Sequence, residues 1–318
     1  MNPIASLSLD LDNQWSYMKT HGDPDWDSFP SYLDLAVPRF LSLLKERGLR
    51  ITVFVVGQDA ALEKNGAALR LLAGAGHEIG NHSFHHEPWL HLYPEEEIQN
   101  EIARAEEAIE RATGQRPRGF RGPGFSLSRA VLRVLARRGY RYDCSTFPTS
   151  IGPLARAFYF LRSNLPREER EKRRQLFGGF REVLRPVDPY RWDLPEGSLL
   201  EIPVTTLPWL RVPIHLSYVL YLSAFSLPLA RAYFGGALAA CRAAGTAPSI
   251  LLHPLDFLSG EDIGALSFFP GMSLPTERKL ACVAACLDQF ARAFDVRCMA
   301  EHADALERAP ELPMLGAA

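Results

Sequence analysis

Two histidines four residues apart and two aspartates near the N-terminus are the residues whose types and spacing could do chemistry. His82 and His86 enclose a His-Ser-Phe-His-His segment, and Asp10 and Asp12 lie in an Asp-Leu-Asp segment. Imidazoles at positions i and i+4 fall on one side of a helical turn, where both can bind one metal ion. With one carboxylate they would form a three-ligand site that keeps a position open for water, and the second carboxylate could act as a base. The pattern predicts metal-assisted hydrolysis.

Simpler explanations exist for each feature taken alone. A single histidine is more often a hydrogen-bonded polar residue than a metal ligand. An aspartate pair can also end a strand in an Asx-type turn. The chain adds an Arg-Gly-Pro-Gly-Phe segment at 121–125 and a Leu-Leu-His segment at 251–253. Their joint occurrence favours a functional site.

The elements that must position these residues alternate between apolar runs and amphipathic stretches. Strands are predicted at 4–9, 51–56, 77–79, 118–121, 140–143, 199–204, 249–252 and 296–299. Helices are predicted at 30–47, 67–73, 94–114, 128–138 and 276–294. Such alternation is typical of an α/β protein with a parallel sheet. The candidate residues fall at or just beyond the C-terminal ends of strands, which form one face in a barrel.

These motifs resemble those of the polysaccharide deacetylases, the NodB-homology group of metal-dependent N- and O-deacylases. The resemblance covers roughly residues 4–145 and 199–300. The first family motif supplies a base and then a metal ligand, which Asp10 and Asp12 match in a spaced form. The other matches are His82, Ser83 and His86 to the second motif, Arg121 and Pro123 to the third, and Leu252 and His253 to the fifth.

The resemblance implies an irregular (β/α) barrel of about seven strands and a set of roles. Asp12, His82 and His86 would hold a divalent metal ion, with zinc expected first and other first-row metals left open. Asp10 would act as the base and Arg121 would orient it, because a guanidinium presents a rigid fork to a carboxylate. From the opposite side, His253 would protonate the leaving amine. Pro123, Phe125 and Trp15 are candidates for substrate binding, Trp15 either by stacking on a sugar ring or as an ordinary packing residue.

The chain departs from the common family pattern in two places. Leu11 separates the two aspartates, and Asn13 stands where the common form has glycine. The spaced form resembles a branch with peptidoglycan-deacetylase-like proteins, allantoinase-like amidases and lipid-linked aminoarabinose deformylases. The fourth motif, Asp-Trp, has no clear copy, and Asp143 and Glu201 are the candidates for a supporting carboxylate.

Length and composition bound the remaining possibilities. With 318 residues, 47% of them hydrophobic, the chain is long enough for one large barrel, which we expect to span 1–318. The net charge of −2 gives no attraction to nucleic acid. The five cysteines are odd in number and lack a Cys-x-x-Cys spacing, so no disulfide framework is indicated. The N-terminus lacks the pattern of a signal peptide, and a cytoplasmic location is expected.

Two stretches lie outside the minimal barrel pattern. The first, at about 150–198, is expected to be a basic helical insertion: between 156 and 185 nine Arg or Lys residues stand against four Glu. It could be a solvated surface or could meet anionic lipid headgroups or a phosphate-bearing substrate. The second is an apolar helical segment at about 212–243, beginning with nineteen residues free of Asp, Glu, Lys and Arg. A buried or substrate-lining helix is favoured there over a peripheral membrane contact or a membrane span.

The expected reaction is removal of an acetyl or formyl group from an amino sugar. The missing export signal, the basic stretch and the apolar segment favour a lipid-linked or membrane-presented sugar, for example on a polyprenyl phosphate. A small-molecule amidase and a deacetylase of soluble or cell-wall polysaccharide are the alternatives. An inactive carbohydrate-binding relative is disfavoured because every expected ligand and base position is filled.

Overall fold

Seven parallel strands carry the candidate site. The computed structural model describes residues 2–151, 183–308 and 311–316. The parallel strands are β1 (Ile4–Asp10), β2 (Thr52–Val55), β3 (Glu78–Asn81), β4 (Gly119–Phe120), β5 (Tyr142–Asp143), β7 (Gly197–Glu201) and β8 (Ser249–Leu252). They are hydrogen-bonded in the order β7-β5-β4-β3-β2-β1-β8.

The two ends of this strand order come together. After β7, the Thr205 N–H donates to Ser249 O at 3.0 Å, and the Ser249 N–H donates to Thr205 Oγ1 at 2.8 Å. The segment that follows β7 therefore lies beside β8, on the edge of β8 that β1 leaves free. The predicted α/β class and barrel-like arrangement of about seven strands are confirmed.

Three further strands extend the sheet. β9 (Asp295–Arg297) pairs with β1, and β6 (Tyr190–Leu194) forms an antiparallel hairpin with β7 that continues to β10 (Met314–Gly316). The hairpin shows that the end of the helical insertion predicted at 150–198 is a strand; residues 152–182 lie outside the described residues, so the rest stays a prediction. Tyr190, Trp192 and Leu194 are buried while the residues between them are more exposed, a period of two that indicates a strand.

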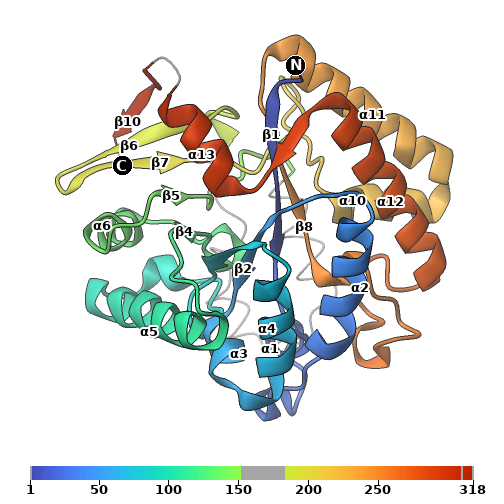
Figure 1. Ribbon diagram of the computed structural model, residues 1–318, viewed down its shortest axis with the longest axis horizontal. Coiled ribbons are helices and arrows are strands. Elements are labelled where there is room, and N and C mark those ends of the chain that lie inside the picture. The colour runs from blue at the N-terminus through green and yellow to red at the C-terminus, as the bar shows by residue number, and fades with distance from the viewer. Residues whose placement is uncertain (1, 152–182, 309–310, 317–318) are drawn as a thin grey trace.

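Helices surround the strands on the outside, as Figure 1 shows. They are α1 (Gln14–His21), α2 (Leu33–Lys45), α3 (Gly57–Ala61), α4 (Gly66–Gly74), α5 (Glu95–Thr113), α6 (Arg129–Arg137), α10 (Leu216–Phe225), α11 (Leu227–Ala244), α12 (Thr276–Ala293) and α13 (Met299–Glu307). Their apolar faces cover a sheet whose central strands are buried, which is why β2 and β8 consist largely of apolar residues.

The apolar stretch predicted at 212–243 forms two helices, α10 and α11. The break between them lies at Ser226, whose hydroxyl accepts a hydrogen bond from the Leu229 N–H at 3.3 Å and caps α11. Pro228 occupies the first turn of α11, where a missing N–H costs least. Among the helices of the described ranges, none has the length and apolar character needed to cross a membrane.

Candidate metal and hydrolytic site

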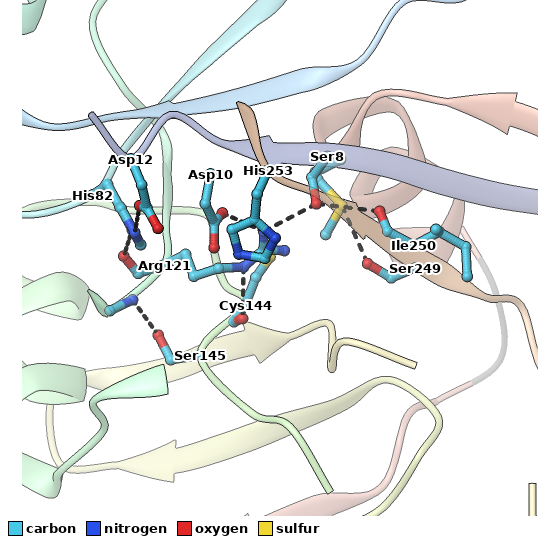
Figure 2. Close-up of polar contacts among 12 residues, drawn as sticks. Ser8, Asp10, Asp12, His82, Arg121, Cys144, Ser145, Ser249, Ile250 and His253 are labelled. Atoms are coloured by element: carbon cyan, nitrogen blue, oxygen red, sulfur yellow. Dashed lines mark hydrogen bonds and ion pairs between the residues drawn. The ribbon is translucent and has the colours of Figure 1, made fainter. Parts of the chain in front are cut away.

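The C-terminal ends of four parallel strands bring the predicted site residues together. Asp10 ends β1, His82 follows β3, Arg121 follows β4, and His253 follows β8. β1 and β8 are paired in register with Leu9 opposite Leu252, so Asp10 and His253 occupy the next positions on neighbouring strands. Figure 2 shows these side chains turned toward one region beyond the strand ends.

The segment 82–86 is an irregular loop, which corrects the helical turn predicted there. Ser83 and His86 both have positive φ angles, of 60° and 52°. Asn81 Oδ1 accepts a hydrogen bond from the Ser83 N–H at 2.8 Å, and Glu101 on α5 accepts bonds from the N–H groups of residues 84 and 85. The two imidazoles therefore converge because tertiary hydrogen bonds hold the loop.

Asp12, His82 and His86 form a buried cluster with the donor set of a metal site. One ligand atom from each residue lies within 4.8 Å of the others. Asp12 Oδ1 is 2.9 Å from His86 Nε2 and 3.3 Å from His82 Nε2. His82 Nδ1 lies 2.7 Å from the carbonyl oxygen of Arg121 and donates to it, which leaves Nε2 as the ligand atom.

The electrostatics of this cluster suit a cation. Burial alone would raise the pKa of Asp12, but the neighbouring His86 and His82 imidazoles hold the pKa well below its ordinary value. A carboxylate that stays ionised and two imidazole Nε2 atoms are common ligands of zinc and other first-row divalent ions. The residues present therefore fit a divalent metal ion.

Arg121 and Asp10 form a buried ion pair next to this cluster. Arg121 Nη1 donates to Asp10 Oδ1 at 2.6 Å and to Ser8 Oγ at 3.0 Å. The Nε group donates to Cys144 O at 3.1 Å, and the guanidinium lies 4.4 Å from the centre of the Phe54 ring. With the arginine 0% exposed, these contacts fix the direction of the Asp10 carboxylate.

His253 approaches from β8, with α10 behind it. Its Nδ1 lies 3.1 Å from Ser217 Oγ, and its ring centre lies 6.0 Å from that of His215. His215 is buried at the start of α10, where burial and then the charges of His253 and Arg121 lower its pKa well below the ordinary value. Ser217 and His215 were not among the predicted site residues, because nothing in the apolar stretch marks them as neighbours of the distant strand end at His253.

The three residues proposed for substrate binding have different surroundings. Trp15 is only 1% exposed, and its Nε1 donates to Asp59 Oδ1 at 3.0 Å. This burial agrees with the packing alternative, and the stacking of Trp15 on a sugar stays a prediction. Phe125 is partly buried, has a φ of 61° and stacks on Phe147 at 4.7 Å, while Pro123 is buried in the same turn. A left-handed backbone at a phenylalanine is strained and often marks a functional turn.

Asp143 and Glu201, the candidates for a supporting carboxylate, lie opposite each other on neighbouring strands. They face one another across β5 and β7, and Glu201 accepts hydrogen bonds from Thr146 N at 2.9 Å and Trp192 Nε1 at 2.8 Å. Asp143 accepts a bond from Ser145 Oγ at 2.6 Å, and the same hydroxyl accepts one from the N–H of residue 122. The pair thus supports the turn after Arg121. Among the hydrogen bonds of the described residues, none joins the pair to His253.

Comparison with known proteins agrees with the family suggested by the motifs. Residues 26–142 match the family model described as polysaccharide deacetylase, which confirms the resemblance for this part of the chain. A peptidoglycan deacetylase from Helicobacter pylori is 25% identical over 154 residues, which is 47% of this chain and 52% of the relative. A peptidoglycan-N-acetylglucosamine deacetylase from Bacillus cereus is 36% identical over 86 residues, which is 27% of this chain and 30% of the relative.

The fold extends over more of the chain than the sequence similarity does. The crystal structure of a candidate polysaccharide deacetylase from Mycobacterium smegmatis superposes with a TM-score of 0.64 and 20% identity. The superposition covers 98% of this chain and 92% of that one, and it shows a shared fold. By contrast, the chain spans only about half or less of the length of the two curated relatives.

Proposed function

We propose that this protein is a metal-dependent hydrolase that removes an N-acyl group, acetyl or formyl, from an amino sugar. The observation that carries the proposal is the placement of the Asp12–His82–His86 cluster beside Asp10, with Arg121 fixing the Asp10 carboxylate at 2.6 Å. The match of residues 26–142 to the polysaccharide deacetylases supports the same reaction class.

The chain's own residues supply the proton transfers of amide hydrolysis. A divalent ion held by Asp12, His82 and His86 would polarise the amide carbonyl and favour ionisation of the attacking water. Asp10 is oriented to take the proton from that water as its oxygen adds to the carbonyl carbon. When the carbon–nitrogen bond breaks, His253 gives a proton to the leaving amine. The products are a carboxylic acid and a free amino sugar.

A lipid-linked or membrane-presented sugar, such as one on a polyprenyl phosphate, is the proposed substrate class. Trp209 is 72% exposed and lies with Leu210 in a short loop closed by a bridge between Thr206 and Pro213. Phe225, at the end of α10, is 73% exposed. Exposed aromatic side chains of this kind suit the interface of a lipid bilayer. The excess of basic residues between 156 and 185 supports an anionic partner, and we place the reaction at the cytoplasmic face of a membrane.

A deacetylase of cell-wall polysaccharide is the second candidate. It is favoured by the curated relatives, which are described as deacetylases of peptidoglycan. Both candidates use the same Asp10, Asp12, His82 and His86 chemistry, so they differ in how the sugar is presented to the site.

The deciding experiment measures amine release by zinc-loaded protein. The substrates are N-formyl and N-acetyl amino sugars on a short prenyl phosphate, peptidoglycan fragments, chitooligosaccharides and allantoin. Turnover confined to the lipid-linked sugars, and lost in Asp10→Asn, would support the proposal. Turnover of peptidoglycan fragments or chitooligosaccharides alone would favour the second candidate, and turnover of allantoin alone would replace both by a small-molecule amidase. No turnover of any substrate would reject the hydrolase.

Membrane presentation has its own test in vesicle sedimentation. The variant Trp209→Asn removes the exposed indole, and asparagine accepts the positive φ of 65° found there. We expect it to weaken binding to vesicles containing phosphatidylserine about tenfold or more. Leu92→Asn is the matched control, because Leu92 is also an exposed apolar residue but lies in the turn before α5. Equal binding by both variants and the parent protein would remove the loop from the proposal.

A further inference from the structure

The candidate metal ligands are carried by two segments that leave the sheet on either side of β2. Asp12 follows β1, the histidine segment 82–86 follows β3, and β2 is hydrogen-bonded to both of these strands. The pairing with β2 ends at the backbone N–H groups of Leu11 and His82, which donate to it at 2.9 and 3.0 Å. Contacts other than the strand ladder must therefore hold the rest of each segment.

The first residues of α3, which directly follows β2, hold the histidine segment. The Gly57 N–H donates to Ser83 O and the Gln58 N–H donates to Phe84 O, both at 2.9 Å. A Cβ atom at residue 57 would lie 2.6 Å from the Cα atom of Ala105, so only glycine lets α3 begin this close to α5. The first N–H groups of a helix have no partner within it, and here they bond to the loop that carries both histidines.

The side chain of Asp59, two residues further along α3, holds the segment after β1. Its Oδ1 atom accepts hydrogen bonds from Asn13 Nδ2 at 2.7 Å, Trp15 Nε1 at 3.0 Å and Asn65 Nδ2 at 3.1 Å. Asp59 and Asn13 are both 0% exposed. Oδ2 has no hydrogen-bond partner among the described residues, so one oxygen of the carboxyl group carries all three bonds.

Asn13 connects this carboxyl group to Asp12. Its Oδ1 atom accepts the N–H groups of Gln14 at 2.8 Å and Tyr32 at 3.1 Å, so both ends of the amide are bonded. The Tyr32 hydroxyl also donates to the carbonyl oxygen of Asp12 at 2.5 Å. The Asp12 carbonyl group and the residue after it are thereby fixed. Asn13 stands where the common form of the motif has glycine, which could not make these side-chain bonds.

We propose that residues 57–59 form a bracket that sets the position of Asp12 relative to the two histidines, with Asp59 as a positioning residue that acts on Asp12 through Asn13. The backbone of the bracket holds the histidine half of the metal site, and the Asp59 carboxyl group holds the aspartate half. This inference rests on the proposed function, because it requires the cluster to bind a metal ion, and it adds residues from outside the motifs.

The first test measures zinc affinity by competition with a chromophoric chelator and needs no substrate. Asp59→Ala removes the shared acceptor and Asn13→Gly removes the link to Asp12, and we expect each to lower the affinity about tenfold or more. Asp59→Asn can keep an oxygen at the Oδ1 position and should recover most of the affinity. Affinity equal to that of the parent protein in both Asp59→Ala and Asn13→Gly would overturn the bracket.

A control separates this effect from a loss of stability. Leu287→Ala opens a cavity at a buried position of α12 and removes no hydrogen bond. If it lowers zinc affinity as much as Asp59→Ala does, the affinity follows stability and the bracket is overturned. Should Asp59→Ala fail to fold, Asn13→Gly carries the test, because glycine is well tolerated at the N-cap position that Asn13 occupies in α1.

The second test reads the coordination geometry and the route of the effect. Cobalt(II) bound at the site absorbs visible light, and its spectrum depends on how its ligands are arranged. We expect Asp59→Ala and Asn13→Gly to change the spectrum alike, and the double variant to lose no more zinc affinity than Asn13→Gly alone, because both substitutions break one link. Additive losses would mean that Asp59 does not act through Asn13 and would overturn that part of the proposal.

The histidine half of the bracket has its own pair of variants. Gly57→Ala forces α3 away from Ala105 and strains the bonds to residues 83 and 84, so zinc affinity should fall about tenfold. Gly74→Ala in α4 is the matched control, because its Cβ atom would meet no other atom within 4 Å. Equal affinity in these two variants would overturn the histidine half.

Failure of the bracket and failure of the proposed function give different results. If the parent protein binds zinc through Asp12 but releases no amine from any substrate, the hydrolase falls, and the titrations still decide the bracket. If the variants keep the affinity and the spectrum of the parent protein, the bracket falls and the hydrolase stands. If the parent protein binds neither zinc nor cobalt, the metal site and the bracket fall together.

Discussion

Two pairs of acidic residues lie near the C-terminal ends of strands in the same sheet, yet their surroundings differ. Asp10 and Asp12 at β1 are matched by a guanidinium and by imidazoles. Asp143 and Glu201, at β5 and β7, lie opposite each other and accept hydrogen bonds from uncharged donors such as Trp192 Nε1. Burial raises the pKa of Asp143. Burial together with the Asp143 carboxylate raises the pKa of Glu201 well above its ordinary value.

The difference shows that burial alone does not determine whether a carboxyl group is charged. Burial disfavours the charged form in both pairs, and the partner decides the outcome. The histidines favour the ionised form of Asp12, whereas burial and the neighbouring Asp143 carboxylate raise the pKa of Glu201 and favour its protonated form. The first pair has the charged partners that the proposed hydrolysis requires. The second stabilises the sheet and, through Ser145, the turn that follows Arg121.

The largest expected effect comes from breaking the ion pair of the first carboxylate pair. Arg121→Met leaves Asp10 buried without its cation, and we expect the free energy of unfolding to fall by about 3–5 kcal/mol. Asp10→Asn in the same protein should recover part of that loss, because it removes the uncompensated charge. Chemical denaturation of the two single variants and the double variant measures the coupling.

The control for this prediction is an ion pair whose arginine reaches the surface. Arg116 is bonded to Glu106 at 2.8 Å, but its side chain is 44% exposed, and Glu106 keeps a second partner in Arg138. Arg116→Met should therefore cost at most about 1 kcal/mol. If Arg121→Met costs no more than this control, the buried pair is not the anchor that its geometry indicates.

The sequence was sufficient to place most of the strands and the ligand candidates. The apolar runs that became β1, β2 and β8 are continuous in sequence, and parallel strands put their C-terminal ends on one face. His82 and His86 lie within one short motif, so their common role could be proposed without the fold. These features are local, or follow from a general rule of topology.

The features that could not be predicted depend on contacts between distant segments. The loop at 82–86 takes its shape from Glu101 on α5, and Trp15 is buried by residues that follow α1. The hairpin at β6 was not predicted, because its alternation of buried and more exposed residues follows a strongly basic stretch of sequence. Ser217 reaches His253 only because α10 packs beside β8. No spacing in the sequence encodes such a pairing.

A smaller effect should separate the two carboxylate pairs by metal affinity. Asp12→Asn removes the charged ligand, and we expect affinity for zinc to fall at least about 100-fold in competition titrations with a chromophoric chelator. Asp143→Asn is the matched control: it makes the same change in a buried aspartate whose partners are Ser145 and Glu201, and its affinity should stay within about threefold of the parent protein. A comparable loss in both variants would mean that the second pair also shapes the metal site.

The smallest effect is a pH dependence that belongs to the second pair. The pKa of Glu201 in the folded protein lies well above the value of 4.5 for a free glutamate. As pH rises above about 4.5, the unfolded chain releases this proton while the folded protein keeps it, so folding stability from this group is present at low pH and is lost as pH rises. Glu201→Gln cannot titrate. We therefore expect its stability relative to the parent protein to improve from pH 5 to pH 8, by on the order of 1 kcal/mol.

The direction in which the relative stability of Glu201→Gln changes with pH tests the raised pKa of Glu201. This test does not depend on how much stability the substitution itself costs. Glutamine has only one oxygen to accept the bonds from Thr146 and Trp192, so Glu201→Gln can be less stable than the parent protein at every pH. The informative quantity is the difference in free energy of unfolding between Glu201→Gln and the parent protein. Its change with pH is measured by denaturant unfolding of the metal-free proteins. The exposed Glu110→Gln should run parallel to the parent protein. If Glu201→Gln also runs parallel, Glu201 is ionised in the folded state, and the two carboxylate pairs are alike in charge after all.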